Sequence, residues 1–147
     1  MKSALYAAGI LQTRSYRVLQ GRVLDCLQDY DLNHAQWVML EVIAKSDGGV
    51  TLRATADALG VKAPLITAMA NELISQGYIT RSGGLEDRRA KFMTITTEGR
   101  AVLGTLDTRL TSILEQLLHG LSIDELTTYE KVLTTIIDNS QKLDDVS

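Results

Sequence analysis

The fold of this chain is decided by residues 51–73, which read TLRATADALGVKAPLITAMANEL. Thr51 can cap the start of a helix through its side-chain oxygen, and Gly60 stands where that helix must end and the chain reverse. Pro64 then falls in the first turn of a second helix, where its missing N–H costs little. The stretch therefore predicts two helices joined by a short turn, which is the helix-turn-helix pattern.

The apolar residues of this stretch have the spacing of two helices that share a core. Ile66, Met69 and Leu73 recur at intervals of three and four residues, the periodicity of one helix face. Ala56 is small enough to allow close contact between the helices, and Leu59 can close the core between them. The pattern thus favours a packed pair of helices over two independent ones.

The segment after them predicts a charged β-hairpin. Residues 78–81 read as a strand, and residues 91–95 read as a returning strand with alternating side chains. The loop between them holds Asp87, Arg88 and Arg89. A lone charged tip is usually a solvated hairpin end with a local ion pair. Because this one directly follows a helix-turn-helix, we interpret it as a wing that lays arginine into a DNA minor groove.

At this point the sequence resembles the MarR (multiple antibiotic resistance regulator) family of bacterial winged-helix transcription factors. The matching elements are Leu32…Gln36…Leu40, Leu73…Gly77-Tyr78-Ile79…Arg81, Asp87-Arg88-Arg89-Ala90 and Ile95-Thr96-Thr97-Glu98-Gly99-Arg100. The resemblance implies a mainly α fold with a small β-hairpin wing, a winged helix-turn-helix dimerised through its N- and C-terminal helices. It also implies a sequence-specific DNA-binding transcriptional regulator, a homodimeric repressor that occupies a pseudo-palindromic operator in double-stranded DNA.

The resemblance implies roles for single residues as well. Arg89 would be the wing arginine in the minor groove, Asp87 the carboxylate that orients it, and Arg88 a backbone or packing residue. Thr67 matches a threonine whose hydroxyl contacts a phosphate, and Lys62 lies at the helix entrance, where a cation suits the nearby backbone. The predicted DNA-binding residues are Arg53, Lys62, Thr67, Asn71, Arg81, Asp87, Arg88, Arg89 and Lys91.

The second helix of the motif departs from the family pattern. Positions that are often basic in the family hold Ala68 and Glu72 here, and Leu65 and Ala70 offer no hydrogen bond to a base edge. Direct reading of bases normally uses Arg, Lys, Asn or Gln. The polar side chains left on this helix to read DNA are Lys62, Thr67 and Asn71. Either specificity depends on Asn71, methyl contacts and DNA shape, or DNA binding has weakened.

The charge distribution agrees with a DNA-binding middle segment. The chain of 147 residues has a net charge of -3, with 45% hydrophobic and 22% charged residues, which is ordinary globular usage. Residues 51–100 hold seven Lys or Arg and five Asp or Glu, whereas residues 101–147 hold three and eight. The middle is therefore +2 and the C-terminal third -5. Negative charge is expected where a dimer body points away from DNA.

The flanking segments predict long helices that need a partner. Residues from about 4 to 30 carry apolar side chains at helical spacing, and Asn33 with Gln36 predicts an N-cap and its reciprocal partner. Thr96 caps a long leucine-rich helix, and a capping box from Ser122 to Glu125 opens the last one. Their apolar stripes exceed what one small core can cover, which favours a homodimer formed by the first and the last two helices.

These segments define a single MarR-like domain over residues 1–147. Residues 1–31 and 101–147 form its helical dimerisation region, and residues 32–100 form its winged helix-turn-helix DNA-binding region. A short strand around Gly49 and Val50 would add to the hairpin.

Residues that carry chemistry are sparse. Cys26 is the only cysteine, and it shares a helical stripe with Leu19 and Val23, which favours a buried apolar role over a redox role. His34 and His119 lie far apart, and no metal-ligand spacing, phosphate-binding loop or nucleophile motif occurs. We therefore expect no enzyme, no metal site and no cofactor.

The N-terminal segment does not predict a membrane or secretory signal. Its apolar start is short, and Arg14 and Arg17 follow it closely. We expect a cytoplasmic protein without a membrane partner.

A small-molecule effector is implied by the resemblance, because members of the family often bind phenolic or other aromatic acids between the dimer body and the winged helix. The candidate ligand-binding residues are Arg14, Tyr16, Tyr30, His34 and Trp37. The alternative is that Trp37 and the tyrosines are aromatics of the core or the dimer interface. A rival function is a winged-helix protein-binding adaptor or antirepressor that has lost operator binding, which Ala68, Glu72 and the acidic balance support.

Overall fold

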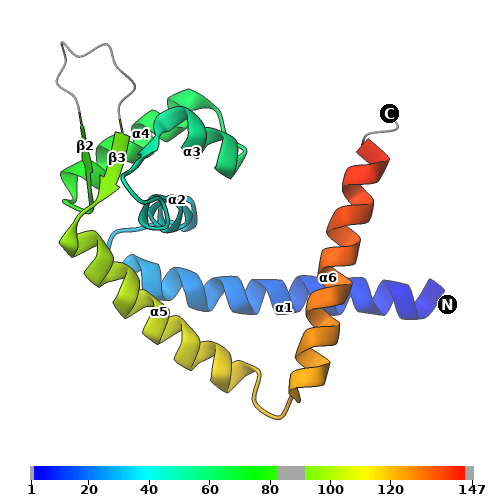
Figure 1. The fold of residues 1–147 in the computed structure, drawn as a ribbon. Helices are drawn as coiled ribbons and strands as arrows, with labels where there is room; N and C mark the ends of the chain where they lie inside the picture. The colour runs from blue at the N-terminus through cyan, green and yellow to red at the C-terminus, as the bar shows by residue number, and fades with distance from the viewer. Residues whose placement is uncertain (1, 83–91, 145–147) are drawn as a thin grey trace. The chain divides into compact units, whose positions relative to one another are not determined.

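The computed structural model describes residues 2–82 and 92–144. Its elements in chain order are α1 (Lys2–Gln28), α2 (His34–Ala44), β1 (Val50–Thr51), α3 (Leu52–Leu59), α4 (Ala63–Ser75), β2 (Ile79–Arg81), β3 (Phe92–Ile95), α5 (Thr97–Leu117) and α6 (Ile123–Asp144) (Figure 1). The chain divides into two compact units, residues 1–113 and residues 114–147. The predicted fold class, mainly α with a small β-hairpin, is confirmed.

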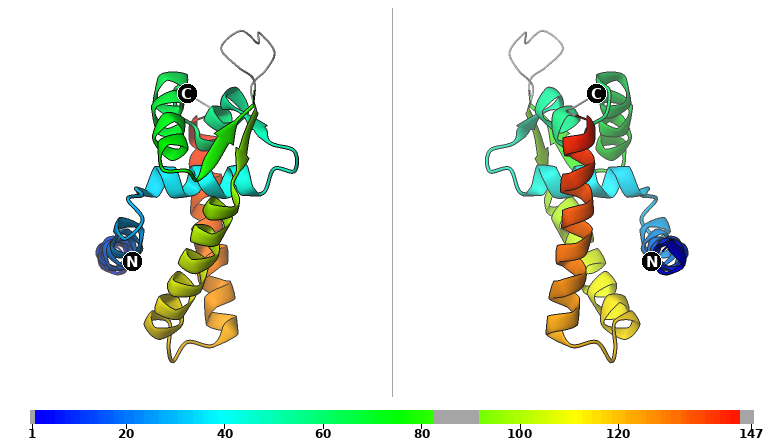
Figure 2. Two further views of the ribbon diagram at one scale, coloured as in Figure 1. Left: turned by 90° about the vertical axis from the view of Figure 1, so that its left-hand side faces the viewer. Right: turned by 90° about the vertical axis from the view of Figure 1, so that its right-hand side faces the viewer.

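The sheet is a small antiparallel one with the strand order β1-β3-β2. In its register, Ile79 of β2 pairs with Ile95 of β3, and Val50 of β1 pairs with Met93 of β3. Figure 2 shows β2 and β3 running side by side between the end of α4 and the start of α5. The predicted hairpin strands and the short additional strand are thus confirmed, whereas the hairpin loop lies outside the described residues.

The helix-turn-helix forms at the predicted capping residues. The Thr51 hydroxyl oxygen accepts a hydrogen bond from the Ala54 N–H at 3.1 Å, and Gly60 ends α3 with a left-handed φ of 66°. Pro64 lies in the first turn of α4. Thr55 is fully buried, and its hydroxyl donates a hydrogen bond to the Thr51 carbonyl. An intrahelical bond thus satisfies this buried hydroxyl group.

The core lies in the first unit, where α2, α3, α4 and the sheet meet the end of α1 and the first turns of α5. Its fully buried large side chains are Leu27, Met39, Leu40, Ile43, Ile66, Leu73, Ile79, Met93 and Leu106. Ala56 and Met69 are also buried, and Leu59 packs against them in part, as the spacing predicted. Cys26 is 2% exposed, which confirms the buried position.

The turn between α1 and α2 is held by side chains that follow α4 in the sequence. The first helix ends at Gln28, earlier than predicted, because the chain reverses through Asp31, which has a φ of 53°. Gln76 donates a 2.8 Å hydrogen bond to the Asp31 carbonyl, and the Tyr78 hydroxyl donates to the Tyr30 carbonyl at 3.2 Å. Gln76 and Tyr78, which follow α4, therefore fix the position of the turn between α1 and α2.

The long helices each carry exposed apolar side chains. On α1 the exposed ones include Leu5, Tyr6, Ile10, Leu11, Tyr16 and Val18, and on α6 they include Ile123, Tyr129, Val132, Ile136, Ile137 and Leu143. No side chain that the structure describes on α6 is buried. Monomeric proteins rarely leave such long apolar stripes uncovered. In the two described ranges, no helix is long and apolar enough to span a bilayer.

Candidate nucleic-acid interface

The helix α4 has one buried and one open face. Ile66, Met69, Ala70 and Leu73 are buried in the core and fix the rotation of the helix about its axis. Leu65, Ala68 and Asn71 are exposed on the other side. Since the core determines which side points outward, these three residues form the surface that α4 offers to a partner.

Glu72 is tied to the neighbouring helix α2. The Gln36 side chain is 3% exposed, and its Nε2 donates a hydrogen bond to the Glu72 carboxylate. The same amide accepts a 2.9 Å bond from the Asn33 N–H through Oε1, and the Asn33 side chain accepts a 2.8 Å bond from the Gln36 N–H. The predicted capping box of α2 is therefore confirmed, and it also holds α4.

This bond gives Glu72 a structural use that sequence reasoning missed. Its partner lies 36 residues away, so no local pattern points to the pair. From the sequence, Glu72 was notable only as an acidic residue at a position that is often basic.

The other polar residues of α4 lie near its start. The Thr67 hydroxyl donates a 3.1 Å bond to the Ala63 carbonyl of the preceding turn, so its proton must leave that carbonyl before it can reach a phosphate. Lys62 occupies the N-cap of α4, is exposed, and makes no side-chain capping bond. Lys62 thus contributes an exposed positive charge at the start of α4.

The remaining predicted DNA contacts divide between described and undescribed parts of the chain. Arg53 is exposed in the first turn of α3, and Arg81 is half-buried at the end of β2. The residues of the wing loop, Asp87, Arg88, Arg89 and Lys91, lie outside the described residues. The minor-groove arginine therefore stays a prediction from the sequence.

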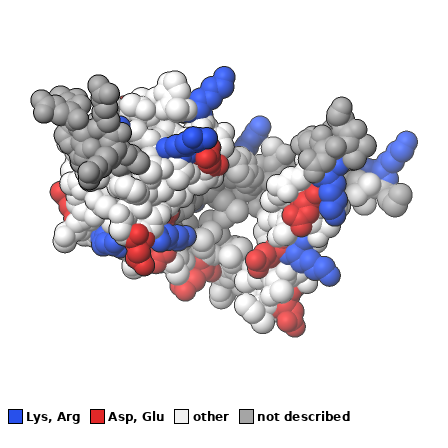
Figure 3. Space-filling model, turned by 45° about the horizontal axis from the view of Figure 1, so that its top comes forward, with Lys and Arg blue, Asp and Glu red and all other residues white. Residues whose placement is uncertain are grey.

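The described surface carries no continuous basic patch on the side that Figure 3 presents. Lys and Arg side chains there are scattered among uncharged and acidic ones. On the outer face of α4, Leu65, Ala68 and Asn71 are uncharged, while exposed Lys62 before the helix and exposed Glu72 carry one charge of each sign.

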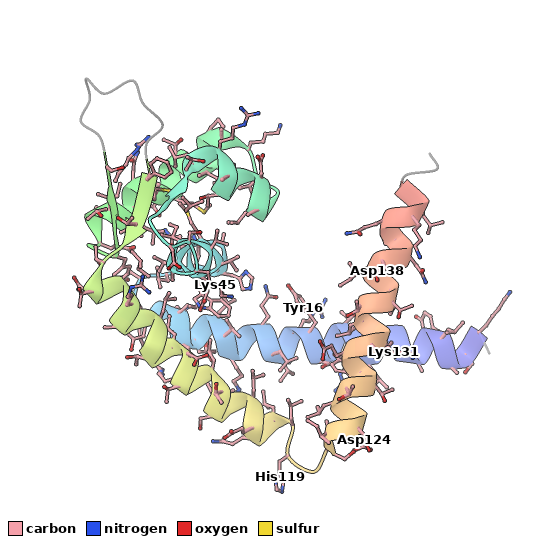
Figure 4. All side chains as sticks on the ribbon, viewed as in Figure 1. Tyr16, Lys45, His119, Asp124, Lys131 and Asp138 are labelled. Atoms are coloured by element: carbon pink, nitrogen blue, oxygen red, sulfur yellow. The ribbon has the colours of Figure 1, made fainter. Side chains whose placement is uncertain are left out.

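The candidate ligand-binding residues are only partly brought together. His34 and Trp37 meet edge to face in the first turn of α2, with ring centroids 5.6 Å apart. Tyr30 follows α1, and its carbonyl oxygen accepts a hydrogen bond from the Tyr78 hydroxyl. Arg14 and Tyr16 are exposed on α1, where Figure 4 labels Tyr16. A surface hollow runs along α1 beside Leu5, Tyr6, Gly9, Ile10, Thr13, Arg14 and Arg17. It includes one of the five candidates, so a shared effector pocket stays a prediction.

A second pair missed by sequence reasoning joins the end of α1 to α5. The Arg109 Nη1 donates a 2.7 Å hydrogen bond to the Asp29 carboxylate, and this ion pair, together with a hydrogen bond to Tyr30, raises the pKa of Arg109. Both side chains are substantially exposed, so the pair orients the helices more than it stabilises them.

Tyr78 connects the sheet to the same turn. Burial raises the pKa of its phenol above the ordinary value, and the nearby carboxylates of Glu98 and Asp31 raise it further. The phenol is therefore held in its neutral form, the only form that can donate the bond to the Tyr30 carbonyl.

The close approach of the start of α5 to Tyr78, just before β2, and to Ile95 of β3 explains one glycine of the sequence motif. A Cβ at Gly99 would lie 2.2 Å from the Tyr78 carbonyl oxygen and 2.9 Å from Ile95 Cγ1. Thr96 receives the Gly99 N–H on its hydroxyl oxygen at 3.0 Å, which confirms the predicted cap of α5. Residues 95–100 thus combine a glycine, which the close approach to Tyr78 requires, with the threonine that caps α5.

A helix-turn-helix followed by a hairpin and flanked by long helices defines a winged-helix protein. Comparison with known proteins names the type. The model of the MarR family matches residues 30–90 of the chain. Over residues 30–90 the chain therefore matches the MarR family, and it has the winged-helix fold of MarR-type regulators.

Solved structures share this fold over nearly the whole chain. A crystal structure of a MarR family transcription regulator has 23% identity and a TM-score of 0.85, and the match covers 99% of this chain and 96% of that one. A transcriptional regulator has 26% identity and a TM-score of 0.72, with coverage of 91% and 98%. CouR from Rhodococcus jostii, solved bound to p-coumaroyl-CoA, has 23% identity and a TM-score of 0.72, with coverage of 88% and 90%.

Proposed function

We propose that this protein is a sequence-specific DNA-binding transcriptional regulator that acts as a homodimer. The observation that carries the proposal is that α4 is fixed on one face and open on the other. Its inner face is buried, Gln36 holds it to α2 through Glu72, and its outer face around Asn71 is open. A helix held this firmly with one open face, next to a hairpin whose loop contains Arg88 and Arg89, is suited to the DNA major groove.

The dimer rests on the exposed apolar stripes of the long helices. Their burial against a second copy would remove apolar area from water, the main favourable contribution to most protein association. Residues 1–31 and 101–147 would form the dimer body, and residues 32–100 would contact DNA. Sedimentation of the purified chain at micromolar concentration tests this: a stable dimer supports it, and a well-folded monomer overturns it.

As a regulator, the dimer would act as a repressor in the cytoplasm by occupying a pseudo-palindromic operator. Two copies of α4 related by a two-fold axis reach successive major grooves when the half-sites are centred about 10 base pairs apart. Within each half-site the direct base contact falls to Asn71, whose amide matches the N6 and N7 edge of adenine.

An effector would bind near the start of α2. The edge-to-face pair of His34 and Trp37 supplies aromatic surface next to the Gln36 capping residue, which in turn holds Glu72. A small aromatic or phenolic acid that displaces Trp37 would therefore shift α4 through the hydrogen bond between Gln36 and Glu72. CouR, which has the same fold, was solved with p-coumaroyl-CoA bound, which supports an aromatic ligand here.

A protein-binding adaptor or antirepressor is the second candidate function. It is favoured by the apolar, weakly charged outer face of α4, where Leu65 is 50% exposed.

Selection from a pool of random DNA duplexes at low and at moderate salt tests the proposal against this rival. The regulator enriches one palindromic sequence that survives moderate salt. An adaptor without operator binding leaves the pool unenriched at both salt concentrations, which would overturn the proposed function.

A further inference from the structure

The outer face of α4 begins with an apolar ridge. We define it by Leu65 and Ala68, both exposed and three residues apart on the helix. Side chains at this spacing are neighbours on a helix surface. The ridge lies in the first two turns of α4, and the N-terminal residues of a recognition helix are those that contact base edges.

Competing polar groups are directed elsewhere. The Thr67 hydroxyl donates to the Ala63 carbonyl within the helix, and the Glu72 carboxylate accepts its bond from Gln36. Asn71, one turn beyond the ridge, is the exposed amide of this face. Over its first two turns, the outer face therefore presents hydrocarbon where other recognition helices present hydrogen-bonding groups.

The major groove offers a matching apolar feature on thymine. A·T pairs present the thymine C5-methyl group there, whereas G·C pairs present hydrogen-bonding atoms alone. A leucine that meets the edge of a G·C pair would leave those atoms without partners and remove water from them. Contact with thymine methyl groups has no such penalty and buries apolar surface on both partners.

We propose that Leu65 and Ala68 form a thymine-reading surface, which contacts C5-methyl groups in each half-site of the operator. This inference rests on the proposed DNA-binding function and names how that function achieves its specificity. Leu65 makes the larger contact because its side chain is longer. Ala68, with a single methyl, restricts how closely the next base edge can approach.

Replacement of thymine by uracil tests the proposal directly. Uracil keeps every hydrogen-bonding atom of thymine and lacks only the methyl group, so the change isolates the apolar contact. The probe is the duplex enriched from the random pool, with deoxyuridine introduced at one symmetry-related thymine pair at a time. Binding is measured with the full chain and with Leu65→Ala, whose exposed position leaves the fold intact.

We expect one thymine position in each half-site at which uracil weakens binding of the parent chain, by about fourfold for each methyl group removed. Thymines outside the half-sites serve as the internal control and show no change. Leu65→Ala binds the thymine duplex more weakly than the parent and no longer distinguishes uracil at the sensitive position.

The outcomes separate this inference from the proposed function. Failure to bind any enriched duplex would overturn the proposed function and this inference with it. Tight, specific binding that no uracil change weakens would overturn the inference alone. Sensitivity to uracil that persists unchanged in Leu65→Ala would also overturn it, because another residue would then read the methyl group.

Discussion

Gln36 donates a hydrogen bond to Glu72 and so joins the N-terminal turn of α2 to α4, the proposed recognition helix. The Gln36 amide is buried at 3% exposure and also accepts a bond from the Asn33 N–H. Every step from the cap of α2 to the surface of α4 is therefore a direct hydrogen bond. Glu72 supports the helix and, because its side chain is exposed, also leaves a negative charge on the surface of α4.

The two roles of Glu72 can be separated with two substitutions. Glu72→Ala leaves the buried Gln36 amide without its acceptor and should lower the free energy of unfolding by about 1–3 kcal/mol. Glu72→Gln keeps an acceptor oxygen and removes the charge, so it should stay nearly as stable as the parent. Urea denaturation of both variants measures the difference. Equal stability of both variants would show that the bond between Gln36 and Glu72 does not stabilise the fold.

The charge itself should weaken DNA binding. At low salt, Glu72→Gln should bind duplex DNA about twofold to fivefold more tightly than the parent, because a nearby charge repulsion in high dielectric is removed. The gain should shrink as salt rises. Fluorescence anisotropy at two salt concentrations measures it, and a loss of affinity at low salt would place Glu72 among the groups that bind DNA favourably.

Gly99 should tolerate no side chain. Gly99→Ala forces α5 away from the Tyr78 carbonyl and should destabilise the fold by about 1–3 kcal/mol through overpacking. Gly104→Ala is the matched control on the same helix, since a Cβ there meets nothing within 4 Å. It should stabilise the fold by about 0.5–1 kcal/mol. Thermal unfolding of the two variants checks the contrast, and similar shifts for both would contradict the close contact at Gly99.

The parts of the fold that could be predicted are those with both partners in one short segment. Thr51 with Ala54, Asn33 with Gln36 and the Ser122 capping box are each separated by three residues, and all three formed. Such caps follow from side-chain chemistry and local geometry alone. The starts of α2, α3 and α6 were therefore predictable from the sequence, whereas the end of α1 at Gln28 was not.

What the sequence could not provide is contact between distant segments. Gln36 and Glu72 are 36 residues apart, and Asp29 and Arg109 are 80 residues apart. No periodicity or spacing links such positions, because tertiary packing alone brings them together. For the same reason the sequence marked Glu72 as a departure from a basic pattern, and only the structure showed the partner that holds it.

Tyr78 should make the fold sensitive to alkaline pH. Its pKa is raised in the folded state, so its contribution to stability is fully present below the ordinary tyrosine pKa of about 10 and is lost as pH rises through the raised pKa. Tyr78→Phe removes the bond to the Tyr30 carbonyl and should lower the free energy of unfolding by about 0.5–1.5 kcal/mol at neutral pH.

Urea denaturation from pH 8 to 11 measures the effect, and the variant should lose less stability than the parent over this range. A parallel decline of parent and variant would show that other groups set the alkaline limit.

Arg89 should carry a large share of DNA affinity. Arg89→Ala should weaken binding to the enriched duplex by about 1–3 kcal/mol, as loss of an arginine placed in a groove does, while the variant stays folded and dimeric. Lys131→Ala on α6 is the matched control, since it also removes one positive charge (Figure 4). Anisotropy titrations at one salt concentration compare the variants. Equal weakening by both variants would show that Arg89 contributes to DNA affinity only through its net charge.

Titration of the full chain with the enriched duplex, and with a duplex of the same composition in scrambled order, tests specific DNA recognition by the dimer most directly. At one moderate salt concentration, the enriched duplex should bind about a thousandfold more tightly, the lower end of the range typical of specific recognition. Binding should saturate at two chains per duplex. Equal affinity for the two duplexes would contradict the proposal that this protein is a DNA-binding regulator.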